Sequence, residues 1–597
     1  MKKIFVIILS AIALVGCTLE EKVISSSEPG KYYQTVPQCL TGLNGCYIPL
    51  RSIYANADYF EACEVATDLI YHSSSSYYDA HCDYTQSIPR FGNTIWNQCY
   101  LGVMRCNAMY ASIERAPLTE EEKTPLLAEC EILRAYYYYI LTINFGDVPY
   151  YFEEVTDANN DKIAQLPRMS AEDLRDILMD NIWMWLGPKS EGCKQALPYI
   201  KTYDPQNEYR IGAMVGFTIA GKLAMWNKDW DRAIKFYSYI EKVYCSTDEE
   251  GLQYTDPRYA LLGYPVKDIM NKNRYSAESI FELPAYSKDY GLRVTHSLAS
   301  RCTPSRSSTT VEGAVEDDEI IDDEEGLDLS KKDDMYNGIR IPELGAEART
   351  TSPYRPTKYF YSSGAFTDFL GTSVPKGLMP YNAKDKRRSR YDTAKAANTE
   401  MVEIEDGGGY LAWCYGGWSK TEKMEETPGD GGVPRHILFF SSTAKPTGRP
   451  FLGDKFWCFG MIYNQDSNNV KIFRFANILL DLAEAQMRMG NWDLANSYLN
   501  APKQRAGLDV VYYTDEVLFM EELYAESGRE LFGEFTRRHN LVRWGIWQER
   551  VMRYSEDSRL RENAAAGPCR IYYPIPDQQV VLSNYNLDNK EYDKYGL

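Results

Sequence analysis

Apolar side chains recur at three- and four-residue steps along much of the first third of the chain, which is the pattern of amphipathic helices. Residues 94–115 form one such stretch. A longer stretch begins after Thr119 and Glu122, whose spacing predicts a capping box at a helix N-terminus, and it ends before Gly146. Residues 25–89, by contrast, predict short helices that alternate with turns.

Two later segments share a pattern that is typical of helix hairpins. Residues 221–240 and 484–499 each predict a helix, a short polar turn and a second helix that opens with Trp-Asp-x-Ala, at Trp230 and at Trp492. Small alanines at a helix crossing and an aromatic ring beside the turn are features of tetratricopeptide repeats. Because the two copies are irregularly spaced, the sequence predicts a degenerate helical-repeat scaffold.

Between these segments the hydrophobic pattern changes. From about 250 to 470, Gly, Pro, Ser and Asp are frequent and helical periodicity is largely absent, with a short strand-like run at 279–283. Irregular regions of this kind often carry binding residues. The sequence therefore predicts one mainly α-helical domain over 17–597, with a tetratricopeptide-like helical body at about 25–250 and 470–597 and a large, irregular, loop-rich ligand region at about 250–470.

The N-terminal residues have the organisation of a bacterial signal peptide. Two lysines precede an uncharged apolar run at 4–15, and Gly16 and Cys17 follow it. The run is too short to span a bilayer, and its end resembles a lipobox, in which the peptide is cut before a lipid-modified cysteine. We therefore expect a signal peptide at 1–16 and a lipid anchor on Cys17, which would hold the protein at a membrane without spanning it. The alternative is an ordinary signal peptide with a chance cysteine.

The overall charge excludes one class of function. Lys and Arg total 65 against 84 Asp and Glu, which gives a formal net charge of −19 over 597 residues. A chain this acidic would repel phosphate backbones, so nucleic-acid binding is not expected. The 48 tyrosines instead favour a recognition surface, because each combines an apolar ring with a polar tip.

The sequence contains none of the common catalytic or metal-binding motifs. The five histidines are scattered, no HExxH, GxSxG or GxxxxGK[ST] motif occurs, and the 14 cysteines form no CxxC or zinc-spaced cluster. Cysteines seven residues apart on one helix, such as Cys39 and Cys46, would be too distant for a disulfide. No catalytic residue, metal or cofactor is therefore predicted. A glycosidase stays open, because it needs only two suitably placed carboxylates.

Several segments match the motifs of one protein family, in the same order along the chain. They are RAYY with FGDVPY at 134–150, RFA with LLDLAEA at 474–485, RAGL at 505–508, ELFGE with NLVRWG at 530–545, and YPIP at 573–576. Their ordered sum resembles the SusD/RagB family of outer-membrane nutrient-binding lipoproteins over essentially the whole chain. Asn540, where the family usually has Asp, and Lys503-Gln504 are departures at structural helix contacts.

The resemblance implies a helical body containing four tetratricopeptide-like units, a loop-rich ligand face and a lipid tether at the outer membrane. It implies that the protein binds oligosaccharide or polysaccharide at the cell exterior and delivers it to a partner SusC-like TonB-dependent transporter. Glu20 and Glu21, just after Cys17, resemble a surface-export signal. We expect a binding protein and not an enzyme; the alternatives are a peptide-binding uptake lipoprotein on the same scaffold and a surface glycoside hydrolase.

A sugar platform requires aromatic rings on exposed loops, because rings stack on the apolar faces of pyranoses. Two segments offer such rings: one follows four serines that disfavour a helix, and the other has glycines that would let a ligand approach the backbone. The predicted ligand-binding residues are Tyr77, Tyr78 and Tyr84 in the first segment, and Trp413, Tyr415 and Trp418 in the second. The alternative is that these rings fill the loop region's own small core. Trp96, by its helical register, is expected in the core.

Overall fold

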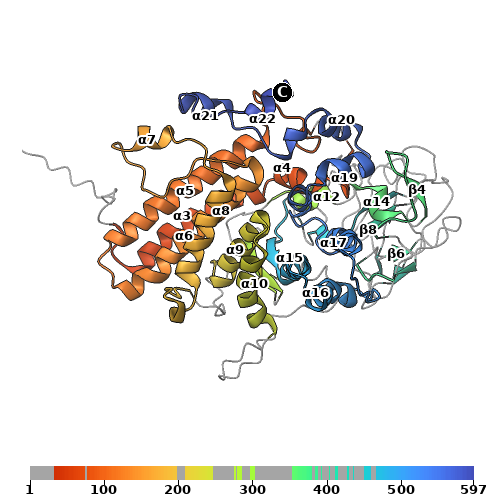
Figure 1. The fold of residues 1–597 in the computed structure, drawn as a ribbon, viewed down its shortest axis with the longest axis horizontal. Coiled ribbons are helices and arrows are strands. Elements are labelled where there is room, and N and C mark those ends of the chain that lie inside the picture. The colour runs from red at the N-terminus through yellow and green to blue at the C-terminus, as the bar shows by residue number, and fades with distance from the viewer. Residues whose placement is uncertain are drawn as a thin grey trace, which may run out of the picture.

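The computed structural model describes the helical body and parts of the loop-rich region. The described residues are 32–73, 77–197, 209–245, 274–276, 278–285, 296–302, 353–362, 364–379, 384–387, 449–458, 461 and 465–597, together with short paired strands between 391 and 435. Helices make up most of this part of the chain (Figure 1). The mainly α-helical fold class predicted from the sequence is therefore confirmed.

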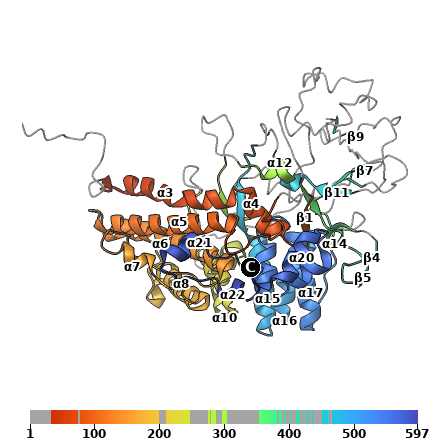
Figure 2. The same ribbon diagram turned by 90° about the horizontal axis from the view of Figure 1, so that it is seen from above.

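Long helices lie side by side in the N-terminal half of the body (Figures 1 and 2). They are α3 (Val36–Tyr54), α5 (Phe91–Arg115), α6 (Glu120–Phe145) and α8 (Ala171–Leu186). The predicted capping box begins α6: the Thr119 backbone N–H donates to the Glu122 carboxylate at 2.9 Å, and the Glu122 N–H donates to the Thr119 hydroxyl at 3.3 Å. Gly146 ends this helix with a φ of 71°, a value that glycine adopts without strain.

Helix α3 corrects the expectation of short helices and turns over 25–89. It runs unbroken for 19 residues, and its apolar face buries Leu43 and Leu50 completely. The helix packs on α5 and α6. Its sequence contains glycines and an internal Pro49, which lower helix propensity. Burial of one face against neighbouring helices, which local sequence does not reveal, outweighs that low propensity.

Both predicted helix hairpins are present. They are α9 (Ala213–Asn227) with α10 (Trp230–Cys245), and α15 (Phe475–Arg488) with α16 (Trp492–Arg505). Gly221 permits the close crossing in the first hairpin, because a Cβ at that position would lie 2.2 Å from Cε1 of Tyr237. Helix α10 also packs on α15. Two hairpins that are far apart in the sequence therefore form one continuous helical body.

The remaining helices are shorter, except for α17, which has 15 residues. They are α4 (Ala57–Phe60) with a π-helical turn at Glu61–Val65, α7 (Asn160–Ala164), α12 (Leu298–Cys302), α14 (Lys358–Tyr361), α17 (Glu516–Glu530), α18 (Arg537–Arg543), α19 (Trp547–Tyr554), α20 (Ser558–Ala566), α21 (Asp577–Leu582), α22 (Lys590–Asp593), and 3-10 turns at Lys189–Glu191, Asp454–Phe456 and Pro568–Ile571. The last five α-helices follow α17 in close succession; α19 and α20 lie near the strands, whereas α21 lies on the side of the N-terminal helices (Figure 1).

The strands are short and form antiparallel pairs. The pairs are β1 (Ile70–His72) with β3 (Tyr354–Pro356), β2 (Ser279–Leu283) with β12 (Val470–Arg474), β4 (Phe366–Thr367) with β5 (Ser373–Val374), β6 (Tyr391–Asp392) with β7 (Val402–Glu403), β8 (Leu411–Cys414) with β11 (Arg449–Leu452), and β9 (Thr427–Pro428) with β10 (Pro434–Arg435). The predicted strand at 279–283 is confirmed as β2. The first two pairs each join a strand of the loop-rich region to a strand of the helical body.

A buried ion-pair network reinforces this junction. The loop-rich region contributes Glu278, Arg387 and Lys455, and the body contributes Arg474, Glu530 and Glu534; the pairs Arg474–Glu278, Arg387–Glu530 and Lys455–Glu534 measure 2.6, 2.7 and 2.9 Å between nitrogen and oxygen. All six side chains are buried. Burial of charges is tolerated only when they are paired and hydrogen-bonded, as they are here.

Trp96 is buried in the core, as its helical register predicted. Two arginines of the family motifs are also paired inside the body: the buried Arg134 with Glu131, and Arg543, whose side chain is 4% exposed, with Glu484. None of the helices in the described part of the chain combines the length and hydropathy that crossing a membrane requires.

Candidate functional site

The first segment of candidate rings lies where the helical body meets the loop-rich region. Helices α4 and α12 contact each other there, close to strand β1 (Figure 2), and β1 pairs with β3 of the loop-rich region. The chain from residue 77 to residue 90 then connects β1 to the start of α5. Tyr77 and Tyr78 therefore lie at the start of this connection, next to the junction of the two regions.

Tyr77 packs against a histidine and an arginine. Its ring centroid lies 4.2 Å from that of His72, with the ring planes tilted by 31°. The Cζ atom of Arg301, on α12, lies 5.2 Å from the same centroid. Arg301 is itself held by Glu61 of the body, whose carboxylate accepts a hydrogen bond from Nη1 at 2.7 Å. The half-buried Tyr77 ring thus rests on side chains from both regions.

Tyr78 is the more exposed of the two rings, at 40% of its surface. The Cζ atom of Arg90 lies 3.7 Å from its ring centroid, and that of Arg559 lies 5.5 Å away. Arg90 donates from Nε to the carbonyl of Asp83 at 3.0 Å, while Arg559 pairs with the Asp83 carboxylate. Sequence reasoning missed these arginines, because residues 90 and 559 meet at Tyr78 only in the folded chain.

Asp79 fixes the turn that presents Tyr78. Its Oδ1 accepts hydrogen bonds from the backbone N–H of Phe91 at 3.1 Å and from the hydroxyl of Tyr573 at 2.8 Å. Burial, opposed in part by these two donors, raises the pKa of Asp79 to about 7. Just before Phe91, Arg90 adopts a φ of 54° at the N-cap of α5, a left-handed value that is rare for a residue with a side chain.

Glu61 is a second buried carboxyl beside this surface. It accepts hydrogen bonds from the Tyr354 hydroxyl at 2.8 Å and from Arg301 at 2.7 Å, and burial raises its pKa to about 7. Raised pKa values are typical of catalytic acids. However, Glu61 and Asp79 are only 1% and 8% exposed and are bonded to protein donors. Neither carboxyl is open to a ligand, so Glu61 and Asp79 are not arranged as a glycosidase pair.

The prediction that Tyr84 contacts the ligand is wrong. It is fully buried, its hydroxyl donates to the carbonyl of Arg570 at 2.6 Å, and it accepts from Nη2 of Arg538 at 2.6 Å. The ring of Tyr573 lies 4.6 Å from its own, measured between centroids. The C-terminal part of the chain thus covers Tyr84, and a ring enclosed in this way offers no surface to a ligand.

The second segment of candidate rings is placed only in part. Trp413 lies in β8 opposite Pro450 of β11, and its side chain is not among those described. Tyr415 and Trp418, like the lipidation candidate Cys17, lie outside the described residues. These assignments therefore stay predictions.

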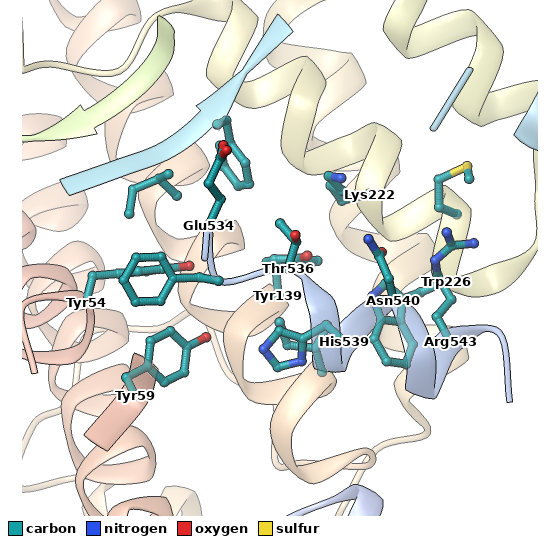
Figure 3. A pocket seen from close by; sticks show the side chains of 15 residues that line it. Tyr54, Tyr59, Tyr139, Lys222, Trp226, Glu534, Thr536, His539, Asn540 and Arg543 are labelled. Atoms are coloured by element: carbon teal, nitrogen blue, oxygen red, sulfur yellow. The ribbon is translucent and has the colours of Figure 1, made fainter. Parts of the chain in front are cut away.

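A small, partly open pocket lies within the helical body (Figure 3). Its volume is about 30 Å³, and Lys222, Glu534, His539 and Arg543 contribute to its polar lining. A cavity of this size holds about two water molecules. Burial and the nearby Arg538 lower the pKa of His539 to about 3, so its ring is neutral. We interpret the pocket as a hydrated gap in the core, because a sugar unit is far larger than water.

The described residues provide neither a metal centre nor an activated thiol. No group of three or more His, Cys, Asp or Glu side chains among them is arranged to hold a metal ion. The cysteines whose side chains are described are free thiols, and all except the half-buried Cys569 are buried. Burial raises the pKa of Cys63 far above its usual range, which keeps that thiol protonated and unreactive.

Two family models match this chain. The model described as "SusD family" matches residues 462–592, and the model described as "Starch-binding associating with outer membrane" matches residues 38–174. The first range contains the helices from α15 to α21 and most of α22, and the second contains most of α3 and all of α5 and α6. Both ranges therefore fall mainly on the helical body, and together they contain the motifs at 134–150, 474–485, 505–508, 530–545 and 573–576 on which the SusD/RagB resemblance depends.

A known relative matches a short part of this chain, whereas solved structures match almost all of it. The SusD-like protein P25 of Formosa agariphila is 29% identical over 131 residues, 21% of this chain and 24% of that relative, so the chain matches about a quarter of its length. A structure described as a laminarin binding SusD-like protein has a TM-score of 0.61 at 16% identity, covering 92% of this chain and 98% of its own. Surface glycan-binding protein A from Bacteroides thetaiotaomicron in complex with laminarihexaose has a TM-score of 0.59 at 17% identity, covering 93% and 99%.

These comparisons bear on two of the predictions. The SusD-like helical fold is confirmed, because the two structures match the chain over almost its whole length. Both of these structures are described by the glycan that they bind, and one matched family is described as starch-binding and associating with the outer membrane. This agrees with the expectation of a binding protein and not an enzyme.

Proposed function

As this chain belongs to the SusD/RagB family, we propose that it is an outer-membrane surface lipoprotein that binds oligosaccharide or polysaccharide. It delivers the bound glycan to a partner SusC-like TonB-dependent transporter. The observation that carries the proposal is the pair of family matches, at 38–174 and 462–592, on a body that has the fold of glycan-binding proteins.

The glycan binds at the junction that presents Tyr77 and Tyr78, with Trp413, Tyr415 and Trp418 as further contacts from the loop-rich region. The exposed Tyr78 and the half-buried Tyr77 support this position, because they lie where β1 and α12 meet. Loops held on a rigid scaffold are the usual place for binding residues.

Calorimetry with the soluble mature protein tests glycan binding. A panel of neutral and acidic polysaccharides is titrated, and at least one is expected to bind without release of shorter products. Tyr78→Ala should weaken that binding by about 1 kcal/mol or more with little change in melting temperature. Tyr595→Ala is the matched control, because Tyr595 is similarly exposed (45%) but lies at the C-terminus. Binding of peptides and of no polysaccharide would replace the proposal by the peptide-uptake alternative, and product release would indicate a hydrolase.

The membrane tether is Cys17, as the lipobox-like sequence supports. Cys17→Ala should move the protein from the membrane fraction to the soluble fraction when the SusC-like partner is also removed. The wild-type chain should copurify with that transporter from detergent. A Cys17→Ala chain that still fractionates with the membrane in the absence of the partner would contradict the anchor.

A further inference from the structure

The two rings of the proposed glycan site, the half-buried Tyr77 and the exposed Tyr78, each have a guanidinium group over one face. These groups are Arg301 over Tyr77 at 5.2 Å and Arg90 over Tyr78 at 3.7 Å. Stacking of a pyranose requires an open ring face. The chemistry that Tyr78 and its neighbours offer to solvent is therefore a cation beside a phenol hydroxyl.

Arg90 differs from the other arginines at this surface. Arg301 is paired with Glu61 and Arg559 with Asp83. Arg90 is held through Nε by the carbonyl of Asp83, and no carboxylate in the described part of the chain lies within ion-pairing distance of it. Its terminal N–H groups therefore remain available to a ligand, in a protein whose net charge is −19.

The neighbouring carboxyl groups are already engaged by the protein. The Asp83 carboxylate pairs with Arg559, and Oδ1 of Asp79 accepts from Phe91 and Tyr573. Burial also raises the pKa of Asp79 to about 7, so this group carries only part of a charge near neutral pH. Little negative charge is thus left to neutralise Arg90.

The backbone of Arg90 is held in an unfavourable conformation. Its φ of 54° lies in the left-handed region, directly before a 25-residue helix, where glycine would fit without strain. Conformations of this kind concentrate at ligand-binding positions, because the surrounding structure holds them in place. Here the hydrogen bond from Phe91 to Asp79 supplies that constraint, and the Arg90 side chain is presented over Tyr78 as a result.

We propose that Arg90, stacked on Tyr78, binds an oxyanion on the sugar chain, so that the ligand of this protein is an anionic glycan that bears uronate carboxylates or sulfate esters. The planar guanidinium fork matches either group with two parallel hydrogen bonds. The inference rests on the proposed function and narrows its ligand to one chemical class.

Matched pairs of glycans test the class of ligand. Oligogalacturonate is compared with its methyl ester, dextran sulfate with dextran, and laminarihexaose serves as a further neutral probe, all by calorimetry with the mature protein. We expect the protein to bind the anionic member of at least one pair and not its neutral counterpart. Which pair responds distinguishes a carboxylate from a sulfate. Affinity should fall as salt is raised, because the contact is electrostatic.

Variants of Arg90 test whether this residue binds the anionic group of the glycan. Arg90→Gln should weaken binding of the anionic glycan at least about tenfold, as the loss of a charge-assisted hydrogen bond predicts. Arg90→Lys, which keeps the charge but not the fork, should have an intermediate affinity. Arg115→Gln is the matched control: it removes one arginine charge from the other end of α5, about 35 Å away, and should leave the affinity unchanged. Melting temperatures show whether each variant is folded.

The outcomes separate the two proposals. If only neutral glycans bind, or if folded Arg90→Gln binds the anionic glycan as tightly as the wild type does, the inference is wrong and the glycan-binding function stands. If no glycan of either class binds, the proposed function itself fails.

Discussion

Glu530→Gln should destabilise the folded protein by about 3–5 kcal/mol. Glu530 is fully buried, and its carboxylate pairs with Nη1 of Arg387 at 2.7 Å, with Nη1 of Arg474 at 2.7 Å and with Nη2 of Arg505. Burial alone would raise its pKa, but these guanidinium groups together hold it well below the usual range. Glutamine keeps the size of the side chain and removes the charge.

The magnitude follows from what the substitution leaves behind. Removing one partner of a buried ion pair leaves the other charge less compensated, and here three arginines share the carboxylate of Glu530. Each arginine keeps another carboxylate partner, such as Asp385 for Arg387 and Glu278 for Arg474 and Arg505, but the buried network gains one net positive charge. The new amide N–H₂ group would also face guanidinium donors. Glu516→Gln is the matched control, because Glu516 and Arg488 form an exposed pair with side-chain exposures of 58% and 30%. An exposed pair contributes only about 0–1 kcal/mol.

Urea unfolding followed by tryptophan fluorescence measures both variants. Because Glu530 joins the loop-rich region to the body, Glu530→Gln should also speed limited proteolysis within 250–470. A carboxylate with a lowered pKa stabilises the fold above its unfolded pKa, near 4.5, and this contribution is lost as pH falls below that value. The difference between wild type and variant should therefore shrink in acid. A loss of stability at neutral pH no larger than that of Glu516→Gln would refute the reasoning.

Gly102→Ala should destabilise the fold by about 1–3 kcal/mol, because the added Cβ would lie 2.2 Å from Cζ of Tyr137. Gly45→Ala, which meets nothing within 4 Å, should instead stabilise it by about 0.5–1 kcal/mol, and changes of the same sign in urea titrations would contradict this packing argument. Asp79→Asn keeps the accepting oxygen and removes the titration. Burial raises the pKa of Asp79 to about 7, so the folded protein binds this proton more tightly than the unfolded chain does. The wild type should therefore lose stability as pH rises from about 4 to 7, and Asp79→Asn should lose less. Parallel pH profiles of stability would exclude a raised pKa of Asp79. Arg90→Gly should be more stable than Arg90→Ala by about 1 kcal/mol, since both lose the side chain but only glycine suits a φ of 54°; equal melting temperatures would show that the backbone is not strained.

Local signals in the sequence were sufficient to predict most of the helical body. The capping box of Thr119 and Glu122, and the hairpins at Trp230 and Trp492, depend on residues a few positions apart, and the structure has them where they were predicted. Helix α3 was missed because burial against α5 and α6 supports it in spite of Pro49. Propensity reports only on neighbours in the chain, and burial is a property of the whole fold.

The same distinction runs through the candidate site. The sequence by itself determined the family, the helical scaffold and a tyrosine-rich loop after β1, because these depend on ordered motifs and local composition. Only the tertiary structure decided that Tyr84 is buried beneath Tyr573, and that Arg90, Arg301 and Arg559 gather around the two remaining rings. Exposure and charge at a surface are set by segments hundreds of residues apart, and the chain brings them together only when it folds.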